Sequence, residues 1–373
     1  MVSRGKPIEE AKNIPVSSPA PELKISARSL EAQNTLARNI ARQRYAALHE
    51  MLDRFGLEQD KLLEYTRYEL SYFANAIAEK NPGLFTEYID WTKSLFKSNG
   101  IPLEYLNKNA DLFCQEVLSE LPVEYHELVG KYIQAGMEEI SGTDKPLHSF
   151  LEYPGPHVDL AQRYLSAVLA GNRGNAIQLV LDYFKTGTSI PDIYLFVLQP
   201  VQYEIGRLWQ TNKITVAQEH FCSAITQLVM SQLYYPHICN SQKTKAVFVG
   251  LCVSGELHEI GIRMVADLFE LAGWNVIFLG ANIPSYNIVD SLIKHKADFL
   301  GISASMASSV NKAANIIAQV RASQAAATKI IVGGFGFNRD PELWKPAGAD
   351  YYAGNAQEAL NIAAAELESK GHG

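Results

Sequence analysis

The spacing of hydrophobic and polar positions changes along the chain, and the change divides it into two parts. From about residue 246 onward, short apolar runs alternate with amphipathic stretches whose apolar positions recur every three to four residues. The apolar runs begin near Ala246, Asn275, Asp298, Lys329 and Asp350. The amphipathic stretches cover Glu259–Ala272, Asn287–Lys296 and Val310–Ala325. Strands that alternate with helices predict an α/β domain with a doubly wound, five-stranded parallel sheet.

Residues 25–240 show the helical period alone. The first five helices are expected at Ala27–Phe55, Glu58–Lys80, Leu84–Ser98, Leu103–Leu121 and Val123–Ile140. After a break rich in Gly and Pro at Ser141–Pro156, four more are expected at Val158–Ala170, Asn175–Thr186, Ile190–Trp209 and Val216–Pro236. The predicted order is a disordered, proline-containing tail (1–24), an all-α domain (25–141), a four-helix bundle (157–240) and the sheet domain (244–373).

Composition excludes several classes of function. The formal net charge of -7 and the absence of a Lys/Arg-rich stripe argue against direct nucleic-acid binding. The chain has four cysteines without metal-ligand spacing, which predicts reduced thiols in a cytoplasmic protein: Cys114, Cys222, Cys239 and Cys252. No run is long and apolar enough to predict a membrane span or an export signal.

The segment Glu256-Leu257-His258-Glu259-Ile260-Gly261 directly follows the first apolar run of the sheet domain. Ligands of such sheets bind outside the carboxyl ends of the strands, where an imidazole can bind a metal and a nearby carboxylate can hold its other ring nitrogen. Forty-one residues separate Gly261 from Ser303-Ala304-Ser305, and twenty-seven separate Ser305 from Gly333-Gly334. A hydrogen bond from Ser303 to Glu256 would complete a relay to His258. A lone histidine after a strand is usually a surface residue, and a Gly pair is usually a turn.

Together these spacings resemble the cobalamin-binding domain of methionine synthase, corrinoid carrier proteins and B12 mutases, over roughly residues 244–370. Their signature is Asp-x-His-x-x-Gly, then Ser-x-Leu, then Gly-Gly; this chain departs at Glu256 and Ser305. The resemblance implies that His258 ligates cobalt. It also implies that the following residues line the cofactor-binding site: Glu256, Leu257, Glu259, Ile260, Gly261, Ser303, Ser305, Gly333 and Gly334.

In the predicted bundle, Trp209 is followed after nine residues by Glu219-His220. Alone, this pattern is ordinary packing, but it resembles the cap of B12-dependent photoreceptors, the light-responsive repressors. That resemblance implies that Trp209 and Val216 lie beside the 5′-deoxyadenosyl group of adenosylcobalamin and that Glu219 and His220 hydrogen-bond it. Gln210 stands where the repressors have a histidine that can ligate cobalt after photolysis. An amide is a poor cobalt ligand, so His220 or water is expected to take the vacated position.

The first helical domain is rich in aromatic residues, and Tyr65, Tyr68 and Tyr72 recur at helical spacing. An aromatic core is the first interpretation. The order of domains also resembles photocobilins, light sensors that bind biliverdin besides adenosylcobalamin. Cys114 and His126 are then the candidates for thioether attachment and pyrrole contact, although both also fit ordinary core or surface positions. The region lacks the helix-turn-helix reader of the repressors.

Two classes of function remain. The first is a non-enzymatic light sensor, a homo-oligomer whose assembly or contacts with a signalling partner change when light breaks the cobalt–carbon bond. The second is a corrinoid carrier in methyl transfer, whose smaller upper ligand gives no role to the polar pair Glu219-His220. A B12-dependent mutase is disfavoured because its substrate barrel needs roughly 250 residues.

Overall fold

The computed structural model describes residues 30–54, 59–78, 80–142, 148–152, 155–238, 246–306 and 309–371. The chain forms two compact units, one made of residues 1–89 and 104–141 and the other of residues 90–103 and 142–373. The tail predicted for residues 1–24 lies outside the described residues. None of the described helices combines the length and apolar character that crossing a membrane requires.

The N-terminal region is helical, as predicted. Its elements are α2 (Leu30–Arg54), α3 (Gln59–Ala78), α4 (Gly83–Ser98), α5 (Leu103–Ser119), the short η1 (Val123–Tyr125) and α6 (His126–Ser141). The core of the first unit is aromatic: the Phe73 ring lies 5.1 Å from that of Phe85 and 5.3 Å from that of Phe113, both edge-on. These rings are buried against one another, so they act as packing residues of the helical unit.

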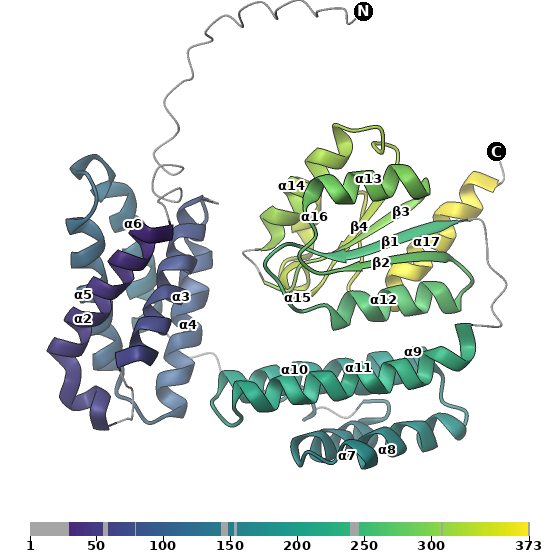
Figure 1. The fold of residues 1–373 in the computed structure, drawn as a ribbon, viewed down its shortest axis with the longest axis horizontal. Helices are drawn as coiled ribbons and strands as arrows, with labels where there is room; N and C mark the ends of the chain where they lie inside the picture. Colours follow the sequence, from purple (N-terminus) through teal and green to yellow (C-terminus); the bar gives the residue numbers. More distant parts are fainter. Residues whose placement is uncertain are drawn as a thin grey trace, which may run out of the picture. The chain divides into compact units, whose positions relative to one another are not determined.

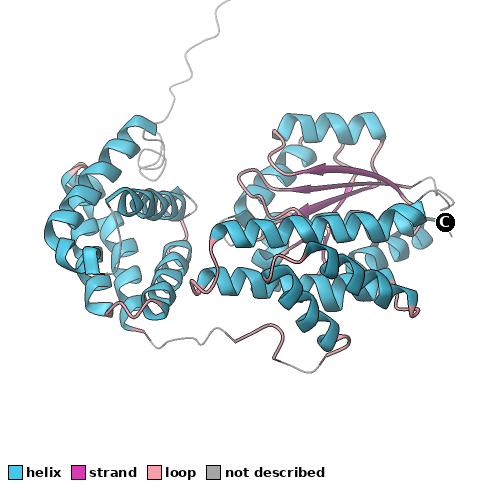
Figure 2. Cartoon of the chain, turned by 60° about the horizontal axis from the view of Figure 1, so that its bottom comes forward, coloured by secondary structure: helices cyan, strands magenta, loops and turns pink. Residues whose placement is uncertain are grey.

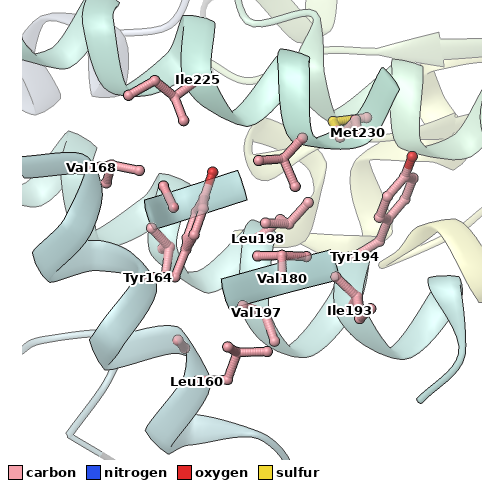
Figure 3. Packing of buried hydrophobic residues seen from close by; sticks show 14 of the residues in the cluster. Leu160, Tyr164, Val168, Val180, Ile193, Tyr194, Val197, Leu198, Ile225 and Met230 are labelled. Atoms are coloured by element: carbon pink, nitrogen blue, oxygen red, sulfur yellow. The ribbon is translucent and has the colours of Figure 1, made fainter. Parts of the chain in front are cut away.

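The predicted four-helix bundle is also present. It consists of α7 (Val158–Leu169), α8 (Arg173–Lys185), a continuous helix of three parts and α11 (Val216–Ile238). The three parts are α9 (Ile190–Ile193), a π-helical turn η2 (Tyr194–Leu198) and α10 (Gln199–Gln210). Figure 3 shows buried side chains of these helices meeting in one core, among them Tyr164, Val180, Leu198 and Ile225.

The sheet domain has the predicted doubly wound topology. Its five parallel strands are β1 (Val247–Cys252), β2 (Asn275–Gly280), β3 (Phe299–Ser303), β4 (Lys329–Gly333) and β5 (Tyr351–Tyr352), in the order β2-β1-β3-β4-β5. Helices α12 (Ile260–Leu271) and α17 (Ala356–Gly371) cover one face, and α13 (Ser285–His295) and α14 (Val310–Arg321) cover the other (Figure 1). Three short helices follow β4: α15 (Phe335–Asn338), η4 (Pro341–Leu343) and α16 (Trp344–Ala347). Figure 2 shows the strands between the two helical layers.

Helix α12 belongs to both the sheet domain and the bundle. On one side its Phe269 stacks on Phe248 of β1, with ring centroids 4.0 Å apart. On the other side its Met264 and Leu268 are buried in the bundle core. The Tyr194 hydroxyl of the π-helical turn also donates a hydrogen bond of 2.8 Å to Asp267 of α12. The bundle and the sheet therefore share a core through α12.

Candidate functional site

The three sequence motifs of the sheet domain come together at the carboxyl ends of three adjacent strands. Cys252, the last residue of β1, pairs with Ser303 at the end of β3, and Ser303 pairs with Gly333 at the end of β4. This register places the loop carrying His258 beside the loop after Ser303 and the turn at Gly334. In a sheet of this topology, that edge is where ligands bind.

The glycine pair after β4 is required by close backbone contacts. A Cβ atom on Gly333 would lie 2.6 Å from the carbonyl oxygen of Ala353, and one on Gly334 would lie 2.6 Å from that of Ala304. Gly334 also has a φ of +96°, which side-chain-bearing residues rarely adopt. The pair thus lets the chain after β4 approach the loops after β3 and β5. An ordinary turn does not require such close contacts with two neighbouring loops.

His258 lies in the loop between β1 and α12 with its side chain exposed. Its backbone carbonyl accepts a contact of 3.5 Å from the Cys252 thiol. Within the described ranges, the imidazole itself takes part in no hydrogen bond or ion pair. Both ring nitrogens are therefore accessible, as a ligand to an incoming metal centre requires.

Glu256 is placed differently from the prediction. Its carboxylate is only 2% exposed and accepts hydrogen bonds from the backbone N–H groups of Ser305 and Met306, at 2.9 to 3.0 Å. Neither the predicted bond from Ser303 nor a contact with His258 is formed.

The root of the His258 loop is anchored by two residues that the sequence did not single out. Asn282, in the loop after β2, accepts a hydrogen bond of 2.7 Å from the Gly255 N–H group. Lys312 of α14 donates one of 3.1 Å to the Ser254 carbonyl oxygen. Asn282 has a φ of +59°, and an Asn shortly after a strand is the only signal that pointed to it. The loop is thus fixed before the histidine, while the imidazole remains exposed.

The remaining residues of the first motif begin α12. Glu259 occupies the N-cap position, and Ile260 packs against the bundle core. Leu257 is largely exposed. A Cβ atom on Gly261 would meet no atom within 4 Å, so packing does not explain this glycine and the space beside it is open.

The predicted cap residues lie around the turn between α10 and α11. Trp209 is in the last turn of α10 and is 42% exposed. The helix ends there because Asn212 adopts a φ of +54° and the Lys213 N–H group bonds to the Leu208 carbonyl oxygen at 2.8 Å. Gln210, which stands where the light-responsive repressors have a histidine, is the last residue of α10.

Helix α11 starts with a capping box that sets the position of the polar pair. The Gln218 N–H group donates to the Thr215 hydroxyl at 3.2 Å, and the Thr215 N–H group donates to the Gln218 side chain at 2.9 Å. Val216 is exposed in the first turn, and the His220 side chain is 68% exposed. His220 Nδ1 lies 3.4 Å from Oε2 of Glu219, whose other oxygen, Oε1, accepts a hydrogen bond of 2.9 Å from the Ser223 hydroxyl. The pair is thus oriented and accessible.

Helix α10 also contacts the carboxyl edge of the sheet. The ring of Tyr203 lies 5.7 Å from that of Phe335, which directly follows Gly334. Trp209 is six residues further along the same helix, or about 9 Å at 1.5 Å per residue. The contact therefore ties the helix that carries Trp209 to the edge that carries His258.

A cavity of about 300 Å³ lies beside α12, between α11 and the edge strand β2. It shares a single residue, Glu259, with the predicted site; the others are Tyr234, Arg263, Ala266, Asp267, Glu270, Val276 and Phe278. Its polar lining differs from the exposed aromatic and imidazole groups at the edge of the sheet, so the two are separate features.

Cys114 and His126, the candidates for bilin attachment, lie in the first unit. Burial and the neighbouring Asp111 raise the pKa of the half-buried Cys114 thiol. A ring nitrogen of His126 lies 3.0 Å from the Leu121 carbonyl oxygen near the end of α5. Cys222 and Cys252 are free and buried, whereas Cys239 lies outside the described residues.

The residues at the sheet edge fit a large metal complex that brings its own equatorial ligands. An exposed imidazole on an anchored loop and open space beside Gly261 would suit such a complex, with His258 as the residue that could bind its metal. This arrangement is compatible with the class of corrinoid-binding proteins.

Comparison with known proteins agrees with this class. Two family models, each described as a B12 binding domain, match residues 246–364 and 160–234. The dimethylamine corrinoid protein 3 of Methanosarcina acetivorans is 30% identical over 159 residues, which are 42% of this chain and 73% of that protein. The HTH-type transcriptional repressor CarH of Myxococcus xanthus is 23% identical over 181 residues, which are 48% of this chain and 59% of the repressor. The chain belongs to the family of B12-binding corrinoid proteins, and it binds cobalamin.

The solved structure of the Methanosarcina barkeri monomethylamine corrinoid protein is 20% identical to this chain. It matches with a TM-score of 0.49, over 56% of this chain and 98% of that protein.

Proposed function

We propose that the protein is a light sensor whose cobalamin is adenosylcobalamin. The observation that carries the proposal is the accessible pair Glu219 and His220 in the first turns of α11, with Trp209 exposed at the end of α10. An adenosyl group presents hydroxyl, amine and ring-nitrogen atoms that such side chains can bond. A methyl group presents none, so a carrier of methyl groups has no use for a polar pair at this position.

When bound, the cofactor supplies a cobalt–carbon bond that light can break. His258 would bind the cobalt from the sheet side. Trp209 and Val216 would pack against the adenosyl group, and Glu219 with His220 would hydrogen-bond it. These contacts are non-covalent, so they hold the group in the dark and release it afterwards. No residue is given a catalytic role.

Output would follow from loss of these contacts. Trp209, Glu219 and His220 lie around the turn between α10 and α11. The surroundings of this turn would change when the adenosyl group leaves. The proposed response is a change in homo-oligomer assembly, or in contact with a signalling partner. Direct nucleic-acid or membrane binding is not part of the proposal.

We also propose biliverdin as a second chromophore, and this part of the proposal rests on the resemblance to photocobilins alone. Its place would be the helical first unit, whose described aromatic residues pack as a core. The two proposals can be tested separately, because the residues proposed for the cobalamin site all belong to the second unit.

The alternative function is a corrinoid carrier in methyl transfer. It is favoured by the relative named a dimethylamine corrinoid protein, of which this chain covers 73%. Both functions use His258 in the same way. They differ in the upper ligand and in the need for light.

The deciding experiment loads the cofactor-free full chain with adenosylcobalamin or methylcobalamin in the dark. Absorption spectra and molecular mass are measured before and after green light. The sensor predicts a change of mass, or of the complex with a partner, for the adenosyl form alone. If both forms respond alike, or neither changes anything except its spectrum, the sensor is rejected in favour of the carrier.

Variants of the polar pair test the assignment of the upper ligand. The double variant Glu219→Gln/His220→Ala should weaken binding of adenosylcobalamin by roughly tenfold, because two hydrogen bonds are lost or weakened, and should leave methylcobalamin unaffected. Tyr235→Ala, an exposed position near the other end of α11, is the matched control. Equal loss of both cobalamins would contradict the role given to the pair.

A further inference from the structure

The side-chain carboxylate of Glu256 holds the loop after β3 by accepting hydrogen bonds from backbone N–H groups of that loop. Both carboxylate oxygens accept the Ser305 N–H group, at 2.9 and 3.0 Å, and one also accepts the Met306 N–H group at 2.9 Å. Successive N–H groups that converge on one anion form a recognised anion-binding arrangement of the backbone. Here the anion is a side chain of the neighbouring loop, only 2% exposed.

The same contacts link the three loops at the carboxyl edge of the sheet. Directly before Ser305, the Ala304 carbonyl oxygen accepts a hydrogen bond of 3.0 Å from Gly336, beyond the glycine pair. The Ala304 N–H group donates one of 3.0 Å to the Gly333 carbonyl oxygen. Glu256 therefore fastens the loop after β1 to a segment that is already bonded to the turn after β4.

No corresponding contact joins Glu256 to the histidine two positions later. Both residues are within the described part of the chain, and neither a hydrogen bond nor an ion pair connects their side chains there. The Ser303 hydroxyl, which was expected to support such a pair, is instead near the position that a Gly334 Cβ atom would take, at 2.9 Å.

We propose that Glu256 is a positioning residue that fixes the loop after β3, and that it does not act through the imidazole of His258. The inference concerns the same cobalamin site but is independent of light sensing. Glu is needed at this position because its side chain reaches the two N–H groups, and one methylene less leaves the carboxylate short of them. The loop is then preformed before the cofactor binds.

Two conservative variants separate this role from a role through the histidine. Glu256→Gln keeps the length and one acceptor oxygen but loses the charge. Glu256→Asp keeps the charge and restores the more common residue, but shortens the arm. If Glu256 acts by holding the loop, its function should be kept better by Glu256→Gln than by Glu256→Asp. If it acts as a partner of the imidazole, its function should be kept better by Glu256→Asp.

The first measurement is hydrogen exchange at the Ser305 and Met306 amides of the cofactor-free full chain. We expect both amides to be protected in the unaltered protein. Protection should fall roughly tenfold to a hundredfold in Glu256→Ala, nearly as far in Glu256→Asp, and less in Glu256→Gln. Glu358→Ala is the matched control: this side chain accepts the Gly354 N–H group at 2.8 Å in another loop, so its loss should expose Gly354 alone.

The second measurement is the visible spectrum and affinity of each variant loaded with aquocobalamin. The spectrum reports whether an imidazole is bound to cobalt. We expect Glu256→Gln to match the unaltered protein in spectrum and Glu256→Asp to bind more weakly. A protein in which Asp keeps loop protection and tight binding, while Gln loses the imidazole signature, would overturn the proposal.

A result without any variant is equally decisive. Free exchange of the Ser305 and Met306 amides in the unaltered protein would show that the clamp does not exist, even if every variant at position 256 fails to fold. Failure of the light response would leave these exchange results unchanged, so the two proposals stand or fall separately.

Discussion

At the scale of single residues, the edge of the sheet combines one exposed imidazole with rigid surroundings. Asn282 and Lys312 hold the loop before His258, and Glu256 holds the loop beside it. An imidazole on such a support loses little freedom when it binds a metal, because its backbone is already ordered.

His258→Ala should weaken cobalamin binding by roughly a hundredfold and remove the spectral signature of an imidazole on cobalt. The reason is loss of the proposed protein ligand to the metal. His295→Ala, at an exposed position in the last turn of α13, is the control and should leave both unchanged. Equally tight uptake by His258→Ala with an identical spectrum would remove the basis of the site.

Gly334→Ala should destabilise the cofactor-free protein by roughly 2–4 kcal/mol. Its Cβ atom would lie 2.6 Å from a backbone oxygen, and the φ of +96° is unfavourable for alanine. Gly206→Ala in α10 is the contrast: it has open space, so it should stabilise by about 0.5–1 kcal/mol through helix propensity. Urea unfolding measures both. Equal effects of the two substitutions would contradict the close backbone contact.

After illumination, His220 or water is the candidate to ligate cobalt from the cap side, because the amide of Gln210 is a poor ligand for cobalt. We expect His220→Ala to alter the spectrum of the illuminated adenosylcobalamin complex, while Gln210→Ala leaves it as it was. Steady-state absorption after green light is the measurement. An unchanged photoproduct spectrum in His220→Ala would assign the position to water.

At the scale of elements, α12 joins the bundle to the sheet through a polar stripe as well as through its apolar residues. Arg263 donates a hydrogen bond of 2.7 Å to Ser231 of α11, and Asp267 accepts one from Tyr194. Glu270 accepts a hydrogen bond from Tyr234. These three positions, spaced by four and three residues, share one face of the helix. Since α12 starts just after His258, the histidine loop leads directly into a helix built into the bundle.

The stability of this junction should depend on pH through Asp267. Burial raises the pKa of Asp267 to about 6, with Glu270 adding to the rise and Tyr194 and Arg263 opposing it. The pKa is higher in the folded than in the unfolded chain, so folding favours the protonated acid. This contribution is complete below about pH 4 and is lost as the pH rises through 6.

Asp267→Asn should therefore be more stable than the unaltered protein at neutral pH, by about 1–3 kcal/mol. The amide carries no charge and still accepts the Tyr194 hydroxyl. The difference in unfolding free energy should grow between pH 4 and 6 and then level off. Urea titrations of the cofactor-free protein across that range test this, and a difference independent of pH would refute it.

At the scale of the whole molecule, the chain consists of two units with separate cores. The second unit contains every residue of the proposed cobalamin site. The first is an aromatic-cored helical unit whose function rests on a resemblance alone. Its one cysteine in the described residues, Cys114, has a raised pKa, which makes the thiolate scarce near neutral pH.

Full-length protein made with a supply of biliverdin should show a red-absorbing band if the first unit binds a bilin. We expect that band to survive in Cys114→Ala and the pigment to be extracted by denaturation, because a scarce thiolate is a poor nucleophile. Absence of the band removes the second chromophore and leaves the cobalamin site intact. A band that persists covalently on the denatured chain and disappears in Cys114→Ala would reverse the prediction for the thiol.

The sequence alone determined the order of elements and the approximate site. Helix and strand periods gave all five strands and the helices of both helical regions, because local hydrophobic spacing reflects which side of an element is buried. His258, Ser303 and Gly333 could be placed together because parallel strands end at the same edge. The assignment of the cap residues remains a prediction.

Only the tertiary structure decided which groups those residues contact. The sequence pointed Glu256 toward His258, yet the carboxylate lies on the Ser305 and Met306 amides, since backbone N–H groups carry no signature in sequence. Beyond the position of Asn282 shortly after a strand, the sequence also gave no sign that Asn282 and Lys312 anchor the histidine loop, or that α12 is shared between two cores. Such contacts depend on side-chain reach and on packing between distant segments, which hydrophobic periodicity does not encode.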